Sequence, residues 1–197
     1  MPFQNRVTPL GELIATSERG LVYGNRGCLH NEYAQIRRQW QVKRWIACRL
    51  EFRGRHRAGG PMPPGRYTGL FFLDDATALA SGHRPCAECR NEDYRSFLAL
   101  TGAPGADDVD RLLHAERLQR FYPALLEDLP DGAFVLEDDA PFLVLADELL
   151  RWAPGGYTQR RSRRRGETKL ITPPTSVRVL ASGWSGSEPL VHPSRPS

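Results

Sequence analysis

Two cysteines, Cys86 and Cys89, are separated by two residues in a chain of 197 residues. Thiolates at this spacing form half of many structural zinc sites, in which four ligands surround the metal. The same spacing occurs in the redox-active pair of thioredoxin-like proteins, and a pair of buried free cysteines is the third interpretation. The elements that position the sulfurs favour one of these interpretations.

Helix and strand signals flank the two cysteines. The apolar run Leu70–Leu73 predicts a buried strand, and the two aspartates after it predict a short helix over residues 76–81 that ends at Gly82. Pro85 suits the first turn of a second helix, which would carry both cysteines on one face and end near Gly102. Because a whole capped helix separates the strand from the cysteines, the pattern favours zinc over a redox pair.

A further strand is predicted before this region. Residues Trp45–Phe52 alternate in polarity, and Cys48 lies on the apolar face. After a loop rich in proline and glycine, Tyr67–Leu73 is expected to pair with that strand as a hairpin. A hairpin that leads to a helix with Cys-x-x-Cys in its first turn is the arrangement of a treble-clef zinc unit. The expected fold class is therefore α+β with a zinc core.

The segment Phe71–Arg90, FFLDDATALASGHRPCAECR, resembles the second half of the zinc-binding N-terminal domain of Ada-type DNA methylphosphotriester repair proteins. The likeness rests on a strand, an alanine-rich helix that ends in glycine, and an Arg-Pro-Cys-x-x-Cys segment, in the same order. It implies an Ada-like zinc domain over residues of about 45–100, and with it DNA binding in repair or processing. The whole chain also resembles a group of bacterial proteins with Asn-Arg-Val-x-Pro and Gly-Asn-Arg-Gly segments, which implies no particular activity.

The resemblance also guides the choice of the remaining zinc ligands. Ada-type domains supply two further cysteines as Cys-x-x-x-Cys, the first of which accepts the methyl group, and this chain has no such pair. Methyl transfer is therefore not expected; Cys48, on the strand that the Ada-like pattern would use, would be its candidate. We expect Cys48 and His30, which follows a glycine-rich turn, to complete the zinc site. His56 is the alternative ligand, and His83 is expected to pack as an aromatic residue.

Basic residues alternate with aromatic ones upstream of the cysteines, a pattern that suits phosphate contacts and base stacking but also an ordinary solvated loop. The Gly-Asn-Arg-Gly segment is either a plain turn or a loop that presents side chains to an anion or the metal. A run of five arginines within residues 160–165 is typical of mobile segments that contact polyanions. The residues expected to contact nucleic acid, with DNA favoured over RNA, are Asn25, Arg26, Arg37, Arg38, Arg53, Arg55, Arg57, Arg161, Arg163 and Arg164, with Trp40 and Trp45 beside them.

One helix carries residues that suit catalysis. Two aspartates at 107 and 108 predict a helix over Val109–Tyr122, which contains His114, Glu116 and Arg117. A histidine and a glutamate near a basic cleft can act as general base and phosphate clamp in a hydrolase. The alternative interpretation is a solvated helix face with internal ion pairs.

The last third of the chain changes character. Short apolar segments at 133–136, 142–146, 149–152, 169–172 and 176–180 predict a small β-rich module. We therefore expect a zinc-binding α+β domain over residues 1–122, the β-rich module over 123–181, and a loosely ordered tail over 182–197.

Composition limits the class of protein. The net charge of +4 and pI of about 9.1 permit a nucleic-acid partner, and the 40% hydrophobic content is typical of a globular chain. No apolar run approaches the roughly 18 residues that span a bilayer, and the cysteine usage suits a reducing cytoplasm. The sequence thus predicts a zinc-dependent DNA-binding protein, with a nucleic-acid phosphodiester hydrolase or a zinc-stabilised scaffold as alternatives.

Overall fold

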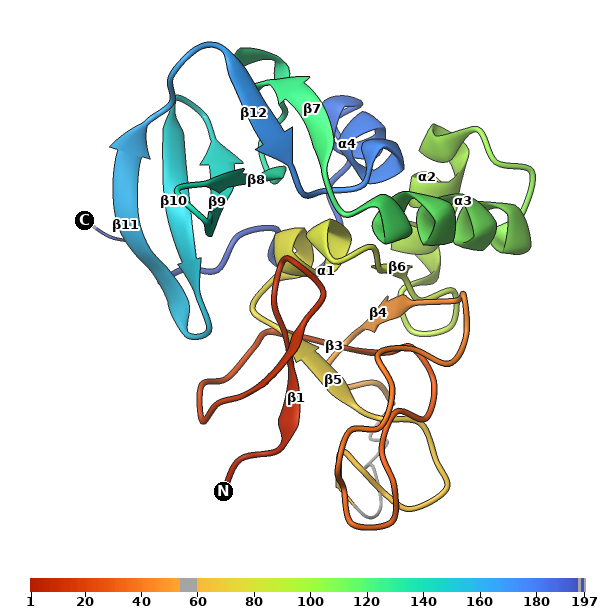
Figure 1. Cartoon of the computed structure of the whole chain (residues 1–197). Helices are drawn as coiled ribbons and strands as arrows, with labels where there is room; N and C mark the ends of the chain where they lie inside the picture. Colours follow the sequence, from red (N-terminus) through yellow and green to blue (C-terminus); the bar gives the residue numbers. More distant parts are fainter. Residues whose placement is uncertain (54–59, 195, 197) are drawn as a thin grey trace.

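The computed structural model describes residues 1–53, 60–194 and 196 and contains two β-sheets joined by helices (Figure 1). The first sheet has the strand order β2-β1-β5-β3-β4-β6, and the second has the order β11-β10-β9-β8-β12-β7. The strands of the first sheet are β1 (Gln4–Val7), β2 (Leu13–Ala15), β3 (Val22–Asn25), β4 (Ile46–Cys48), β5 (Leu70–Phe72) and β6 (Arg84–Pro85). Those of the second are β7 (Tyr122–Leu125), β8 (Phe134–Glu137), β9 (Ala140–Leu145), β10 (Glu148–Ala153), β11 (Gly156–Ser162) and β12 (Glu167–Leu170). The expected α+β class is confirmed.

Helix α1 (Asp75–Ala80) lies between the two sheets, and all its residues are buried (Figure 1). Ala78 packs with the core of the first sheet, whereas Ala76 and Ala80 pack with the core of the second. The predicted cap is confirmed, because the Asp74 carboxylate accepts a hydrogen bond of 2.9 Å from the Thr77 amide. Alanines leave room on both sides of this helix, so α1 is the element that joins the two cores.

Three further helices pack together beside α1. They are α2 (Asn91–Thr101), α3 (Ala106–Gln119) and α4 (Pro174–Ala181), and a short 3₁₀ turn covers Leu126–Asp128. Phe97, Leu113 and Val179, one from each helix, share a buried cluster with Leu79 of α1 and Trp184. Helices α2 and α3 belong to the range expected to form the first domain, whereas α4 belongs to the range expected to form the β-rich module. The shared cluster therefore packs the two ranges together.

The predicted hairpin of the first sheet is wrong in its pairing. Strand β3 lies between β4 and β5 and pairs antiparallel with both. Gly24 allows this close packing, because a Cβ on it would lie 2.2 Å from the carbonyl oxygen of Ile46. β4 instead gains a parallel partner in β6, with Ile46 opposite Arg84.

Two expectations for the end of the chain also differ from the structure. The segment 176–180 is helical, because Pro174 occupies the first turn of α4 and the Glu116 carboxylate accepts hydrogen bonds from the Thr175 amide and hydroxyl. The expected loose tail packs on the protein over residues 184–194. For example, the carbonyl oxygens of Pro189 and Leu190 accept hydrogen bonds from the first amides of α1.

Candidate metal centre

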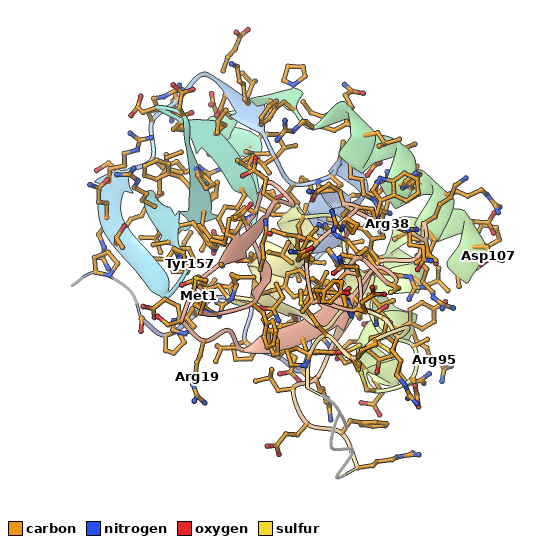
Figure 2. The ribbon with its side chains drawn as sticks, turned by 60° about the horizontal axis from the view of Figure 1, so that its bottom comes forward. Met1, Arg19, Arg38, Arg95, Asp107 and Tyr157 are labelled. Carbon is orange, nitrogen blue, oxygen red and sulfur yellow. The ribbon has the colours of Figure 1, made fainter. Side chains whose placement is uncertain are left out.

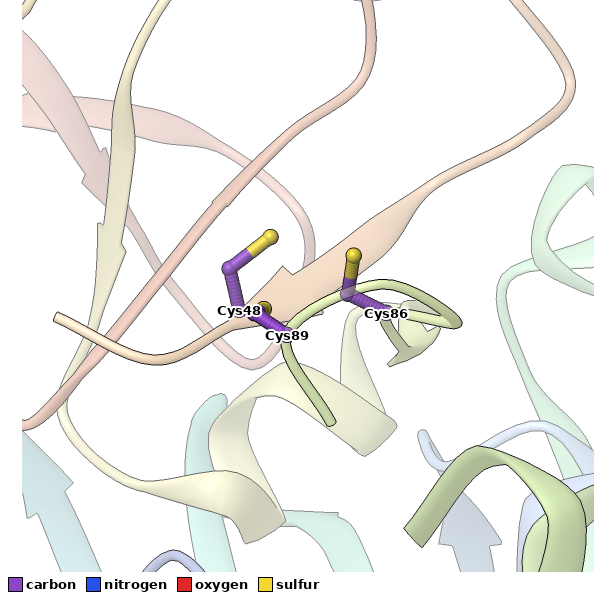
Figure 3. A group of neighbouring side chains, drawn as sticks. All are labelled: Cys48, Cys86 and Cys89. Carbon is purple, nitrogen blue, oxygen red and sulfur yellow. The ribbon is translucent and has the colours of Figure 1, made fainter. Parts of the chain in front are cut away.

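Three cysteine side chains converge where β4 meets the turn before α2 (Figure 3). The sulfur atoms of Cys48, Cys86 and Cys89 all lie within 4.8 Å of one another, and all three thiols are free. Sulfurs bound to one tetrahedral zinc at about 2.3 Å are about 3.8 Å apart, so a small movement would bring the three onto one ion. Three of the four expected ligands, the Cys-x-x-Cys pair and Cys48, are therefore brought together.

The β4–β6 pair positions these sulfurs. The Arg84 amide donates to the Trp45 carbonyl oxygen at 3.1 Å, and the Cys86 amide donates to that of Ala47 at 2.8 Å. These ladder bonds keep Arg84 and Pro85 extended, so the expected start of a helix at Pro85 is wrong. Helix α2 begins at Asn91 instead, and a turn closed by the Arg90 amide and the Cys86 carbonyl oxygen carries the two cysteines.

The electrostatics of the cluster suit a soft cation. Hydrogen bonds from Cys48 and Cys89, together with the amides of Cys89 and Glu88, lower the pKa of the Cys86 thiol. Hydrogen bonds to Cys86 and Cys89, followed by burial, raise the pKa of the Cys48 thiol. A bound divalent cation would favour ionisation of all three thiols. Three soft sulfur donors fit Zn²⁺.

A pocket of about 500 Å³ opens beside the cysteines. Its wall contains Asn25, one of the expected contact residues, and the phenol ring of Tyr67. Three exposed arginines, Arg44, Arg49 and Arg66, line it as well, and none of them is in the set of residues expected to contact nucleic acid. Arg49 and Arg66 lie on different loops that meet only in the folded chain. Their spacing along the sequence therefore does not predict that they line one pocket.

His30, the expected fourth ligand, lies outside the cysteine cluster in the described part of the chain. Its Nδ1 atom lies 2.6 Å from the Thr68 hydroxyl and its Nε2 atom lies 3.1 Å from the Pro63 carbonyl oxygen. Both ring nitrogens therefore have partners, and His30 is a buried link between two loops. His56, the alternative ligand, lies outside the described residues, as do Arg55 and Arg57. His83 packs as expected, with its ring centroid 5.0 Å from Trp45 and 4.6 Å from Phe72.

The basic residues upstream of the cysteines fall into two groups. Arg37, Arg38 and Arg53 are exposed, and Figure 2 shows Arg38 on the side of the molecule that carries α3. Arg26, in contrast, is fully buried. It therefore cannot contact a nucleic-acid backbone on the surface as expected.

The arginine run at 160–165 is held by the second sheet rather than free. Arg161 forms an ion pair of 2.7 Å with Asp138, and Arg164 forms one of 2.9 Å with Glu137. Arg163 donates hydrogen bonds to the carbonyl oxygens of Leu126, Leu129 and Ala146. Much of the positive charge expected to meet a polyanion is thus compensated or used to stabilise the fold.

The residues of the expected catalytic group do not converge. Glu116 caps α4, and Arg117 donates to the carbonyl oxygens of Leu113 and Lys43. His114 packs edge-on against Trp40 at a centroid distance of 4.6 Å, and burial, followed by the nearby Arg117 and Lys43, lowers its pKa. The three side chains have separate tasks, so this geometry gives no support to a hydrolase.

Comparisons with known proteins add no family to this geometry. No family model matches the chain, and neither the curated proteins nor the solved structures contain a significant match. Among the described residues, no helix is long and apolar enough to cross a membrane. The functional argument therefore rests on the site itself.

Proposed function

We propose that the protein binds zinc through Cys48, Cys86 and Cys89 in an Ada-like core and contacts DNA beside that site. The observation that carries the proposal is the meeting of the three sulfurs with arginines in one pocket. Zinc in this role is structural: it ties β4 to the turn before α2 and orders the loops around them. The chain's own residues then present the arginines to phosphates.

The pocket has the composition of a nucleic-acid contact. Arg44 and Arg66 supply positive charge at its wall, where Arg49 pairs with Glu188 at 3.4 Å, and Phe52 and Tyr67 supply aromatic rings. Guanidinium groups bind phosphates in a salt-dependent way without reading sequence, while aromatic rings stack on bases. Asn25 adds an amide that can donate and accept hydrogen bonds in the same wall. Together they favour binding that is largely independent of sequence.

Metal analysis tests the first half of the proposal. We expect one zinc per chain in the wild type, and its loss in Cys86→Ser and in Cys48→Ser. His30→Ala should keep its zinc, because the histidine has other partners. Retention of zinc by both cysteine variants, or a wild type that takes up no zinc when refolded with it, would refute the site.

DNA binding tests the second half. Fluorescence anisotropy with a labelled DNA, measured between about 50 and 200 mM salt, gives the slope of log K against log salt. Each phosphate contact that a substitution removes should make this negative slope less steep by about one unit. Arg44→Ala and Arg66→Ala should each weaken binding and reduce that slope. Arg151→Ala is the matched control, because Arg151 is exposed on β10 in the second sheet. Equal effects of all three substitutions would mean that the pocket does not contact DNA.

A further inference from the structure

A second pocket lies at the other end of the β4–β6 pair and holds two arginines that form no ion pair with a carboxylate of the described residues. Arg26 is fully buried, and its Nε and Nη1 atoms find no hydrogen-bond acceptor among the described residues. The Nη1 atom of Arg117 is buried and without an acceptor in the same part of the chain. Buried guanidinium nitrogens normally have partners, so three such atoms in one place point to a missing anion.

Both arginines stack on the same aromatic ring, that of Trp45. The guanidinium carbon of Arg26 lies 4.3 Å from the centroid of the Trp45 ring, and that of Arg117 lies 4.1 Å from it. Cation–π contact offsets part of the cost of burial but does not neutralise either charge. Backbone carbonyl oxygens fix both side chains: Gly11 accepts from Arg26 at 2.9 Å, and Leu113 accepts from Arg117 at 2.8 Å.

The Gly-Asn-Arg-Gly segment explains how Arg26 reaches this place. Gly27 has a φ of +108°, and a Cβ on it would lie 2.6 Å from the Cβ of Gln41, so only glycine fits there. The loop turns immediately after Arg26, and its carbonyl oxygen accepts a hydrogen bond from the Gln41 amide at 3.1 Å. The segment is therefore a tight turn that places Asn25 in the wall of the cysteine pocket and Arg26 in the wall of the second pocket.

The surroundings leave an excess of positive charge. Three arginines and one glutamate line the pocket, which gives it a net charge of +2. The glutamate, Glu12, already pairs with Arg120 at the exposed rim at 3.4 Å. Asp110 and Glu116, which face Arg117 from its own helix, hold Arg84 and the start of α4 respectively. Lys43 and the buried His83 lie nearby as well, and burial, followed by Arg26 and Arg117, lowers the pKa of His83 well below its usual value.

Burial lowers the pKa of Arg26 to about 9 and, together with the nearby Arg26 and Arg84, lowers that of Arg117 to about 9 against the opposing effect of Asp110. An anion that enters the pocket would therefore stabilise the charged form of both arginines. In the described chain, the only hydrogen bond of Arg26 to another side chain is to Gln39, whose Oε1 atom is 3.5 Å from Nη2. That contact is too long to be a good hydrogen bond, and an oxygen of a ligand can replace it.

We propose that this pocket binds a phosphate monoester, with Arg26 and Arg117 as its anion-binding residues and Trp40 beside its organic part. Paired guanidinium groups match the oxygens of a phosphate. The cavity of about 330 Å³ lies at the small end of ligand pockets, which span roughly 300–1,000 Å³, so it accepts a small organic phosphate or the end of a chain rather than a strand. Trp40, Leu10 and Leu118 supply apolar wall for the group that carries the phosphate. The site stands whether or not the cysteine pocket binds DNA.

Thermal unfolding of the zinc-loaded chain tests the site. In buffer without phosphate or sulfate, adenosine 5′-monophosphate at about 100 times its Kd should raise the Tm by about 5–10 °C, and adenosine should not. Inorganic phosphate should raise it at higher concentration. In Arg26→Met and Arg117→Met the rise should disappear, whereas Arg19→Met, which changes an exposed arginine at the edge of the molecule (Figure 2), should keep it.

Two oligonucleotides of the same sequence distinguish the sources of the phosphate. If the 5′-phosphorylated form raises the Tm more than the 5′-hydroxyl form, and Arg26→Met removes the difference, the occupant is a DNA end. If only the mononucleotide acts, it is a free ester. If one arginine variant does not fold, the other still decides. Absence of any rise with all probes, or an undiminished rise in the arginine variants, would overturn the proposal.

Discussion

The two ends of the β4–β6 strand pair each collect groups of one kind, and the two kinds suit ions of opposite charge. At one end, Cys48 and Cys86 meet Cys89, and three soft sulfur donors together suit a cation. At the other end, Trp45 and His83 stand directly before the two strands, and Arg26 and Arg117 stack on the Trp45 ring. Only two or three residues of backbone separate the ends. A short strand pair thus separates the three cysteines from the two uncompensated arginines.

The difference between the ends shows what paired and unpaired charge mean in this fold. Arg84, which lies between them on β6, has a bidentate ion pair with Asp110 at 2.8 Å, and Arg90 has one with Asp75 at 2.6 Å. These arginines are buried and fully compensated. Arg26 is as deeply buried as Arg90 but has no carboxylate bonded to it in the described chain. Compensated arginines serve the fold, whereas the uncompensated pair is open to a ligand.

The largest effect should come from removing the metal. A structural zinc contributes on the order of 10 kcal/mol to the folded state, so a chelator should lower the Tm of the zinc-loaded wild type steeply, and Cys86→Ser should resemble the chelated protein. Cys28→Ser is the control, because Cys28 lies outside the cluster, with its Sγ 3.7 Å from the His30 carbonyl oxygen. A chelator that leaves the Tm unchanged would mean that the sulfurs do not hold a structural ion.

An intermediate effect should follow when a compensated arginine loses its partner. Asp110→Asn leaves the buried Arg84 charge facing a neutral amide, and we expect it to lower the free energy of unfolding by about 3–5 kcal/mol. Asp108→Asn, on the same helix, removes an exposed pair with Arg111 and should cost under about 1 kcal/mol. Urea denaturation of both variants measures the contrast. Similar losses in both would remove the distinction between a compensated core arginine and a surface pair.

The sequence revealed local features of this architecture better than long-range ones. The Asp74 cap, the end of α1 at Gly82, and the convergence of Cys48 with the Cys-x-x-Cys pair all follow from patterns within a few residues or from a recognisable motif. The place of β3 between β4 and β5 does not follow from any local pattern, because strand order depends on partners far apart in the chain.

The same limit explains the errors at single residues. His30 is satisfied by Thr68, which lies 38 residues away, so no local pattern shows that its ring has partners. The arginine run is compensated by Glu137 and Asp138 from the β8–β9 turn. Arg26 looked like a surface contact because its neighbours are polar, and its burial depends on Trp45 and α3.

The smallest effect should also be the most specific for the anion end. In Gln39→Glu, the new carboxylate takes the place of the amide oxygen 3.5 Å from Arg26 and compensates the charge within the chain. We expect this variant to be more stable than wild type by about 1 kcal/mol without ligand, and its Tm to respond less to adenosine 5′-monophosphate.

Gln35→Glu adds the same charge to the same loop, but beside the exposed Arg37, so its stability and its response should stay close to wild type. Thermal unfolding with and without the mononucleotide distinguishes the two variants. If Gln39→Glu destabilises the chain while the ligand response persists, the two buried guanidinium groups do not need an anion, and the contrast between the ends of the strand pair fails. If the response is lost and stability rises, the carboxylate has done within the chain what the phosphate does from solution.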